Sequence, residues 1–126
     1  MTISGDTGAP IYLRVAQWLE DRILDGSLQE EQRLYSQYQL AEMFNINPAT
    51  AAKGLTLLVE DGTAYKKRGL GMYVAQNARA RIFEKRRGGA FSEMTLSLVA
   101  EAKRLGISEE GLIARIRQIY ESEAGE

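Results

Sequence analysis

The residues of this sequence that could carry out chemistry are mainly carboxylates and basic side chains. The chain contains no cysteine and no histidine, which excludes a thiol nucleophile, a zinc-thiolate site, a disulfide and a histidine base. Adjacent carboxylates occur at Glu30-Glu31 and at Glu109-Glu110. The first pair falls in an expected loop and the second in the first turn of an expected helix, where the helix dipole stabilises acidic residues. We therefore expect no enzyme activity, no metal site and no cofactor.

Positive charge is concentrated in one short segment. The whole chain has 16 Lys and Arg against 17 Asp and Glu, for a net charge of −1. Residues 63–87 have a balance of +7, whereas residues 1–62 have −5 and residues 88–126 have −3. A local field, rather than the net charge, attracts a phosphate backbone. The segment is therefore typical of a nucleic-acid contact, although a solvated basic helix face would give the same balance.

The length and composition indicate one folded domain with an appendage. The chain has 126 residues, of which 44% are hydrophobic and 26% charged, as in an ordinary globular protein. No apolar run approaches the ~20 residues that cross a bilayer, and the first ten residues lack a signal pattern, so we expect a cytoplasmic protein with no membrane contact. Residues 1–9, rich in glycine, serine and threonine, are expected to form a flexible arm.

Three helices are predicted between residues 10 and 62. The first opens at Pro10, ends at Asp25-Gly26, and has apolar residues four apart at Ile11, Val15, Leu19 and Ile23. The second opens at Ser36, which forms a capping box with Gln39, and ends at Asn45. The third opens at Asn47-Pro48, because asparagine is a strong N-cap and proline suits the first helical position. It ends at Asp61-Gly62, and its expected inner face is Ala51, Leu55, Leu58 and Val59.

A β-hairpin is predicted after the third helix. Short β-forming runs flank Arg68-Gly69-Leu70-Gly71, whose glycines suit a turn. This turn is not a dinucleotide-binding fingerprint, because the third glycine and the strand-turn-helix context are missing. Two helices joined by a short turn and followed by a hairpin form a winged helix-turn-helix. The predicted fold is therefore mainly α with a small β-hairpin, and we assign the DNA-binding domain to residues 10–75.

Residues 76–126 are predicted to form a helical dimerisation segment. A basic helix, 78–87, is broken at Gly88-Gly89, a second runs over 90–105, and Ser108 caps a third. Their apolar residues recur at spacings of three and four: Phe91, Met94, Leu98, Ala102, Leu105, Leu112, Ile113, Ile116, Ile119 and Tyr120. These faces need a partner, either the chain's own winged domain or a second copy. Two-fold symmetric operators favour the second copy, and so a homodimer.

The expected DNA contacts lie at the start of the third helix and in the wing. A recognition helix presents its N-terminal residues to the major groove. Thr50 suits a phosphate or a base edge, unless its hydroxyl bonds back to its own helix, and Lys53 suits a phosphate. Gly69 and Gly71 permit positive φ and a close backbone approach. The full candidate set is Ser36, Tyr38, Asn47, Pro48, Ala49, Thr50, Lys53, Lys66, Lys67, Arg68, Gly69 and Gly71.

Four motifs, in this order and at this spacing, resemble the GntR family of bacterial regulators, and specifically its small YtrA-like branch. Pro10-Ile11-Tyr12-Leu13 with Ile23-Leu24-Asp25-Gly26 resembles the first helix of the family. Leu34-Tyr35-Ser36-Gln37-Tyr38-Gln39-Leu40-Ala41 resembles its Leu-Pro-Ser-x-Arg-x-Leu-Ala block. Asn47-Pro48-Ala49-Thr50 resembles the Asn-Pro-x-Thr start of the recognition helix, and Arg68-Gly69-Leu70-Gly71 the Arg-Gly-x-Gly wing. The resemblance implies a sequence-specific, DNA-binding repressor that dimerises through its C-terminal helices.

Two positions depart from the family pattern. Tyr38 stands where the family has an arginine that contacts DNA, and Ala52 stands where a cation is often found. The Tyr38 phenol either donates to a phosphate or packs beside Tyr35. Both departures keep a second hypothesis open, a winged-helix module for protein association with weakened or lost DNA binding. The sequence identifies neither the operator nor a small-molecule effector.

Overall fold

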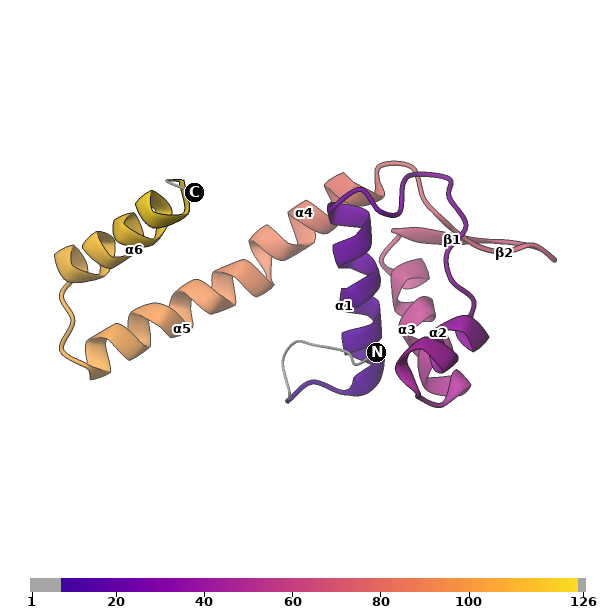
Figure 1. Cartoon of the computed structure of the whole chain (residues 1–126), viewed down its shortest axis with the longest axis horizontal. Coiled ribbons are helices and arrows are strands. Elements are labelled where there is room, and N and C mark those ends of the chain that lie inside the picture. Colours follow the sequence, from indigo (N-terminus) through magenta and orange to yellow (C-terminus); the bar gives the residue numbers. More distant parts are fainter. Residues whose placement is uncertain (1–7, 125–126) are drawn as a thin grey trace. The chain divides into compact units, whose positions relative to one another are not determined.

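The computed structural model describes residues 8–124, so most of the expected N-terminal arm lies outside the described residues (Figure 1). The chain divides into two units, of which the first ends at Lys85 and the second begins at Arg86. In chain order the elements are α1 (Ile11–Leu24), α2 (Gln37–Phe44), α3 (Pro48–Glu60), β1 (Ala64–Lys67), β2 (Gly71–Val74), α4 (Ala78–Gly88), α5 (Ala90–Arg104) and α6 (Glu109–Ala124). This mainly helical chain with one antiparallel hairpin confirms the predicted fold class. No helix among the described residues is long and apolar enough to span a membrane.

The core of the first unit lies between α1, α2 and α3. The apolar stripe of α1 is buried at Val15, Leu19 and Ile23, and burial of each such side chain contributes about 1.5–3 kcal/mol. Gly54 lets α3 approach α1 closely, because a Cβ built on it would lie 2.9 Å from the Tyr12 carbonyl oxygen. The remaining buried apolar residues include Leu40, Phe44, Ala51, Leu55, Leu58, Ala64 and Val74.

One residue that was predicted on the inner face of α3, Val59, is partly exposed instead. Val59 is 36% exposed, whereas Leu58 is 1% exposed. Consecutive helical residues point about 100° apart, so burial of Leu58 turns its neighbour toward the rim.

The predicted helix ends are confirmed around the helix-turn-helix. The Ser36 side chain accepts from Gln39 N at 3.1 Å and the Gln39 side chain accepts from Ser36 N at 2.8 Å, which completes the capping box. Asn45 ends α2 in the left-handed conformation, with φ of 55°. The Asn47 side chain accepts from Ala49 N at 2.8 Å, with Pro48 at the first position of α3. These caps satisfy amide donors that an unpaired helix start would leave without partners.

The hairpin formed by β1 and β2 has a third, short partner that the sequence did not predict. Lys67 pairs with Gly71 next to the turn, and Ala64 pairs with Val74 at the base of the hairpin. Residues before α2 then pair with β2 on its other side, where Leu34 N donates to Met72 O at 2.8 Å and Val74 N to Gln32 O at 2.9 Å. The wing is therefore extended at its base by the segment around Arg33, which forms an isolated bridge with Tyr73.

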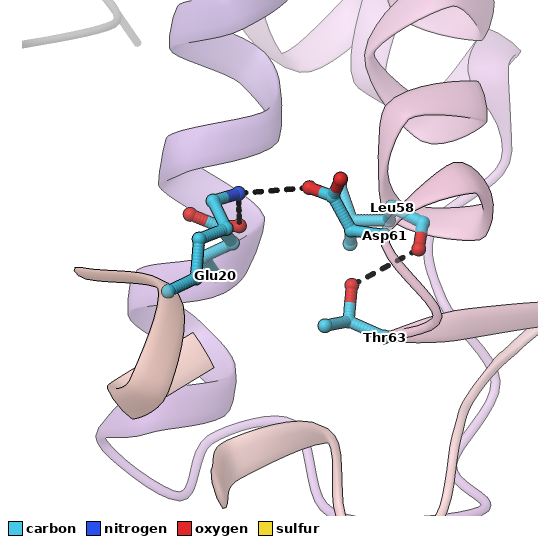
Figure 2. Close-up of polar contacts among 5 residues, drawn as sticks. Glu20, Leu58, Asp61 and Thr63 are labelled. Atoms are coloured by element: carbon cyan, nitrogen blue, oxygen red, sulfur yellow. Dashed lines mark hydrogen bonds and ion pairs between the residues drawn. The ribbon is translucent and has the colours of Figure 1, made fainter. Parts of the chain in front are cut away.

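Most of α4 packs with the first unit, although its sequence places it in the predicted dimerisation segment, residues 76–126. Ala78 and Ile82 are fully buried in the core. Lys85 Nζ lies 2.5 Å from Glu20 Oε2 on α1 and 2.8 Å from Asp61 Oδ2 after α3 (Figure 2). Two residues after Asp61, the buried Thr63 hydroxyl donates to the Leu58 carbonyl at 3.1 Å, which closes the turn from α3 into β1. The first unit thus extends past the expected boundary at residue 75.

The second unit consists of α5 and α6 with the last residues of α4. Gly106 follows the end of α5 with φ of +70°, and the Ser108 hydroxyl accepts from Gly111 N at 3.1 Å at the start of α6. The end of α5 at Gly106 and the start of α6 at Ser108 were both predicted. Every described residue of α5 except Ala102 is exposed, so this unit has almost no core of its own.

Candidate nucleic-acid interface

The start of α3 presents small, exposed residues. Asn47, Pro48 and Ala49 are exposed, and Thr50 is half-buried. The side-chain oxygen of Asn47 is occupied by the helix cap, while its amide N–H groups stay available as donors. Short side chains at these positions let the positive end of the helix approach a phosphate or a base edge.

The Thr50 hydroxyl makes no hydrogen bond within the described part of the chain. Thr56, two turns further along α3, instead donates back to the Ala52 carbonyl at 3.0 Å. The alternative raised for Thr50, a bond back to its own helix, is therefore not what the structure has. Its hydroxyl keeps both its donor and its acceptor capacity for a ligand.

Lys53 is held against α1. Its Nζ lies 4.0 Å from the centroid of the Tyr12 ring, a cation–π contact worth about 0.5–1 kcal/mol at an exposed site. The contact limits where the ammonium can go while leaving it exposed on the outer side of α3. Sequence patterns did not predict this pairing, because Tyr12 and Lys53 lie on different helices.

Tyr38 is a free surface residue at the start of α2. Its side chain is 69% exposed. Tyr35 pairs instead with Trp18, at 5.9 Å between ring centroids, and Trp18 pairs with Phe44 at 5.1 Å. The proposed packing of Tyr38 beside Tyr35 is therefore wrong. Ser36, next to it, uses its hydroxyl oxygen for the capping box.

The wing residues divide between two faces of the hairpin. Lys66 pairs with Met72 and so shares the face of the buried pair Ala64 and Val74, whereas Lys67 points to the opposite face. Lys67 Nζ lies 4.2 Å from the centroid of Tyr73. Lys66 and Lys67 are thus neighbours in sequence that the pleat places on opposite faces, and Arg68 follows them in the turn.

The tip of the wing is a tight turn. Leu70 N donates to the Lys67 carbonyl at 2.9 Å, and both Gly69 and Gly71 have positive φ, +78° and +100°. Arg68 and Leu70 are exposed there, Leu70 by 58%. The backbone conformation explains why glycine occupies both positions.

Part of the basic segment is used inside the protein. Lys85 binds two carboxylates, and the Arg79 guanidinium donates to the Leu24 carbonyl at 3.0 Å. The +7 balance of residues 63–87 therefore overstates the charge that is available to a ligand.

One of the two carboxylate pairs that could have suggested catalysis, Glu30 and Glu31, has structural partners. Glu30 accepts from Asn77 N at 2.8 Å, and Glu31 accepts from the Tyr65 hydroxyl. This hydrogen bond from Tyr65 raises the pKa of its phenol above the ordinary value of 10.0. Among the described residues, no group of three or more acidic side chains is placed to hold a metal ion.

Arg33 is a candidate that sequence reasoning missed. It lies in the acidic part of the chain, and only its pairing with Tyr73 places it at the wing. No local pattern in the sequence could have found it.

The candidate dimerisation residues are exposed, with two exceptions. The large exposed apolar side chains of α5 and α6 are Phe91, Met94, Leu96, Leu98, Val99, Ile113, Ile116, Ile119 and Tyr120, at 38–73%, and Leu105, directly after α5, is 66% exposed. Leu112 is half-buried, and Ala102 is 6% exposed and so lies inside the unit rather than on its outer face.

Comparison with known proteins gives one family. Residues 11–74 match the family described as bacterial regulatory proteins, gntR family. The HTH-type transcriptional repressor YtrA of Bacillus subtilis (strain 168) is 27% identical over 113 residues, which are 90% of this chain and 86% of YtrA. Three other curated relatives, each named as a repressor, are longer, and the chain spans about a third of their length.

Solved structures agree with the sequence match. A GntR family transcriptional regulator from Listeria monocytogenes is 28% identical, with a TM-score of 0.74, over 90% of this chain and 98% of that one. The structure of AraR(DBD) in complex with operator ORE1 is 25% identical, with a TM-score of 0.52, over 60% of this chain and 93% of that one.

Proposed function

The chain belongs to the GntR family of bacterial regulatory proteins, and from this premise we propose that it represses transcription by binding an operator in duplex DNA as a homodimer. The match to YtrA over most of both chains fits the YtrA-like subfamily. The observation that carries the proposal is the placement, in one compact unit, of an exposed helix start and a cationic wing.

The start of α3 is the part that would read the operator. Asn47 and Thr50 offer an amide donor and a free hydroxyl, the two kinds of group that bond base edges or phosphates. Lys53, one turn further on, is placed for the phosphates that flank the groove. In this arrangement the two neutral side chains would distinguish one operator sequence from another, and the lysine would add affinity.

The wing would supply phosphate contacts. Lys66 and Arg68 are exposed and have no hydrogen bond or ion pair with the rest of the described chain. Each contact that neutralises a phosphate releases counterions, so its contribution depends on salt. The wing, with its tip at the Arg68-Gly69-Leu70-Gly71 turn, would contact the DNA groove next to the one that α3 would enter.

A second copy of the chain would cover α5 and α6. Their apolar side chains are exposed over two helices, and a surface of this kind on a bacterial regulator calls for a partner. Two-fold symmetry presents two winged units to two half-sites of one operator. We assign dimerisation to the segment after Lys85, and DNA binding to the unit before it.

The same proposal places the protein in the cytoplasm, with DNA as its partner and no catalytic step. The family and its relatives are transcription regulators, and repression needs only occupancy of the operator. No cofactor enters this mechanism.

Titration of duplex DNA at several salt concentrations tests the proposal. We expect the triple variant Lys66→Ala, Lys67→Ala, Arg68→Ala to flatten the slope of log affinity against log salt by ~0.9 for each phosphate that a protomer no longer neutralises. The control, Lys103→Ala with Arg104→Ala, removes two cations from α5 and should leave the slope unchanged. An unchanged slope in the triple variant would contradict the wing assignment. Absence of any salt-dependent binding by the parent would favour the association module instead.

A further inference from the structure

The two-stranded wing is extended on one side by a short bridging segment. The segment before α2 runs along the free edge of β2, with backbone bonds from Leu34 N to Met72 O and from Val74 N to Gln32 O. Between these bonds, Arg33 lies directly opposite Tyr73. Residues paired across antiparallel strands point to the same face, so Arg33 shares the face of Tyr73.

On this face two cations, Lys67 and Arg33, lie near the tip of the wing. Tyr73 pairs with Tyr65, and Lys67 pairs with Gly71, so all four belong to the same face as Arg33. The Tyr65 and Tyr73 rings lie 6.1 Å apart, and the Lys67 ammonium lies over Tyr73. Arg33 reaches this face from the edge of β2 that is not paired with β1.

The Arg33 guanidinium lies over Gly71. A Cβ built on Gly71 would lie 3.2 Å from Arg33 Nε and 3.4 Å from one of its terminal nitrogens. The missing side chain therefore leaves the space that the guanidinium occupies. Because Gly71 is the first residue of β2, the charge lies beside the turn at the tip and not at the base of the hairpin.

The Arg33 guanidinium has no ion-pair partner within the described chain. Arg33 is exposed and has no hydrogen bond or ion pair there, whereas Arg22 donates to Asp25 at 3.0 Å. The nearest acidic residues in the sequence bind other groups, Glu30 the Asn77 N–H and Glu31 the Tyr65 hydroxyl. A free guanidinium presents a planar fork of donors that matches two phosphate oxygens.

We propose that Arg33 is a further phosphate-binding residue, acting beside Lys67 on the outer face of the wing. The inference rests on the proposed function, since it assigns one more contact to the same DNA interface. It also means that the phosphate contacts come from both the basic segment and the acidic part of the chain.

The experiment compares variants of the full chain on one mixed-sequence duplex of about 30 base pairs between about 50 and 200 mM salt. Phosphate contacts are independent of sequence, so the operator is not needed. We expect Arg33→Gln to flatten the slope of log affinity against log salt by ~0.9 per bound protomer, with about a five- to tenfold weaker affinity at about 0.1 M salt. Arg33→Lys should keep the slope of the parent, since it keeps the charge. Arg22→Gln removes an arginine already paired with Asp25 and should also keep it.

The outcomes separate this inference from the proposed function. If Lys67→Gln flattens the slope and Arg33→Gln does not, the duplex is bound through the wing and the role of Arg33 is wrong. If the parent shows no salt-dependent binding, the proposed function fails and the inference fails with it. If Arg33→Gln and Arg22→Gln weaken binding equally, the effect is one of net charge and the specific contact is overturned. Circular dichroism of each variant confirms that the fold is kept.

Discussion

Lys85 and Glu20 join the last helix of the winged unit to its first. Lys85 Nζ lies 2.5 Å from Glu20 Oε2, and the Glu20 side chain is 3% exposed. A buried carboxylate is costly unless it is paired, so this contact requires α4 to stay docked on α1. Asp61 binds the same ammonium from the end of α3. Three helices that are far apart in sequence therefore meet at one lysine.

Replacement of this lysine tests the docking. We expect Lys85→Met to lower the free energy of unfolding by about 1–3 kcal/mol, because it removes a hydrogen-bond donor from a buried carboxylate. We expect a loss at the lower end of this range, because the lysine side chain is about half exposed and water screens the interaction. Urea unfolding followed by circular dichroism measures it. Lys103→Met, on the exposed side of α5, is the control and should change stability by less than about 0.5 kcal/mol. Equal stability of the two variants would show that the ion pair does not hold α4.

The same group predicts a dependence on alkaline pH. Partial burial acts to lower the pKa of Lys85, but hydrogen bonds from its ammonium to Asp61 and Glu20 outweigh it and raise the pKa above the ordinary value of 10.5. A pKa raised by folding means that the ammonium stabilises the native state fully below pH 10.5 and loses this contribution as the pH rises through the folded value. The stability difference between the parent and Lys85→Met should therefore shrink above pH 10.5. Tyr65 also titrates in this range, so the comparison must be made between variants rather than on the parent alone.

The close approach of α1 and α3 at Gly54 gives a stability test of its own. A Cβ at this position would lie 2.9 Å from a backbone oxygen of Tyr12, which has little freedom to move. We expect Gly54→Ala to cost about 1–3 kcal/mol, as overpacking does in other cores. Gly88→Ala, in a helix with nothing within 4 Å of the new Cβ, should be neutral or slightly stabilising. Thermal unfolding of both variants distinguishes a clash from an effect of helix propensity.

Sequence reasoning predicted the features that depend on neighbouring residues. The capping box of Ser36 and Gln39 and the Asn47-Pro48 helix start are satisfied within three residues, so their chemistry can be recognised in one short window. Contacts between distant residues could not be found in this way. Arg33 meets the wing only because residues before α2 add to β2, and Lys85 meets Glu20 only because α4 folds back on α1.

The end of the winged unit depends on α4, and truncations test it. Residues 78–87 were predicted to be a basic helix of the dimerisation segment, yet Ala78 and Ile82 are fully buried. Truncation after Asn77 should therefore expose the core and lower stability. Truncation after Gly88 should leave a folded, monomeric winged unit with weaker DNA binding. Light scattering gives the mass of each, and the full chain should be a dimer at tens of micromolar. A monomeric full chain would contradict the role given to α5 and α6.

Tyr38 allows the alignment of α2 on DNA to be tested directly. Its ring is 69% exposed and has no aromatic partner among the described residues, so substitution there should leave the fold intact. If the phenol donates to a phosphate, Tyr38→Phe should weaken binding by about 0.5–1.5 kcal/mol, the net worth of a neutral hydrogen bond. Tyr38→Arg should tighten binding and steepen the salt slope by ~0.9 per protomer, because a guanidinium adds a charged contact. Titration of the three proteins on the same duplex at two salt concentrations measures both effects. If Phe binds as well as Tyr and Arg gives no gain, the start of α2 does not face the DNA backbone, and recognition then rests on α3 and the wing alone.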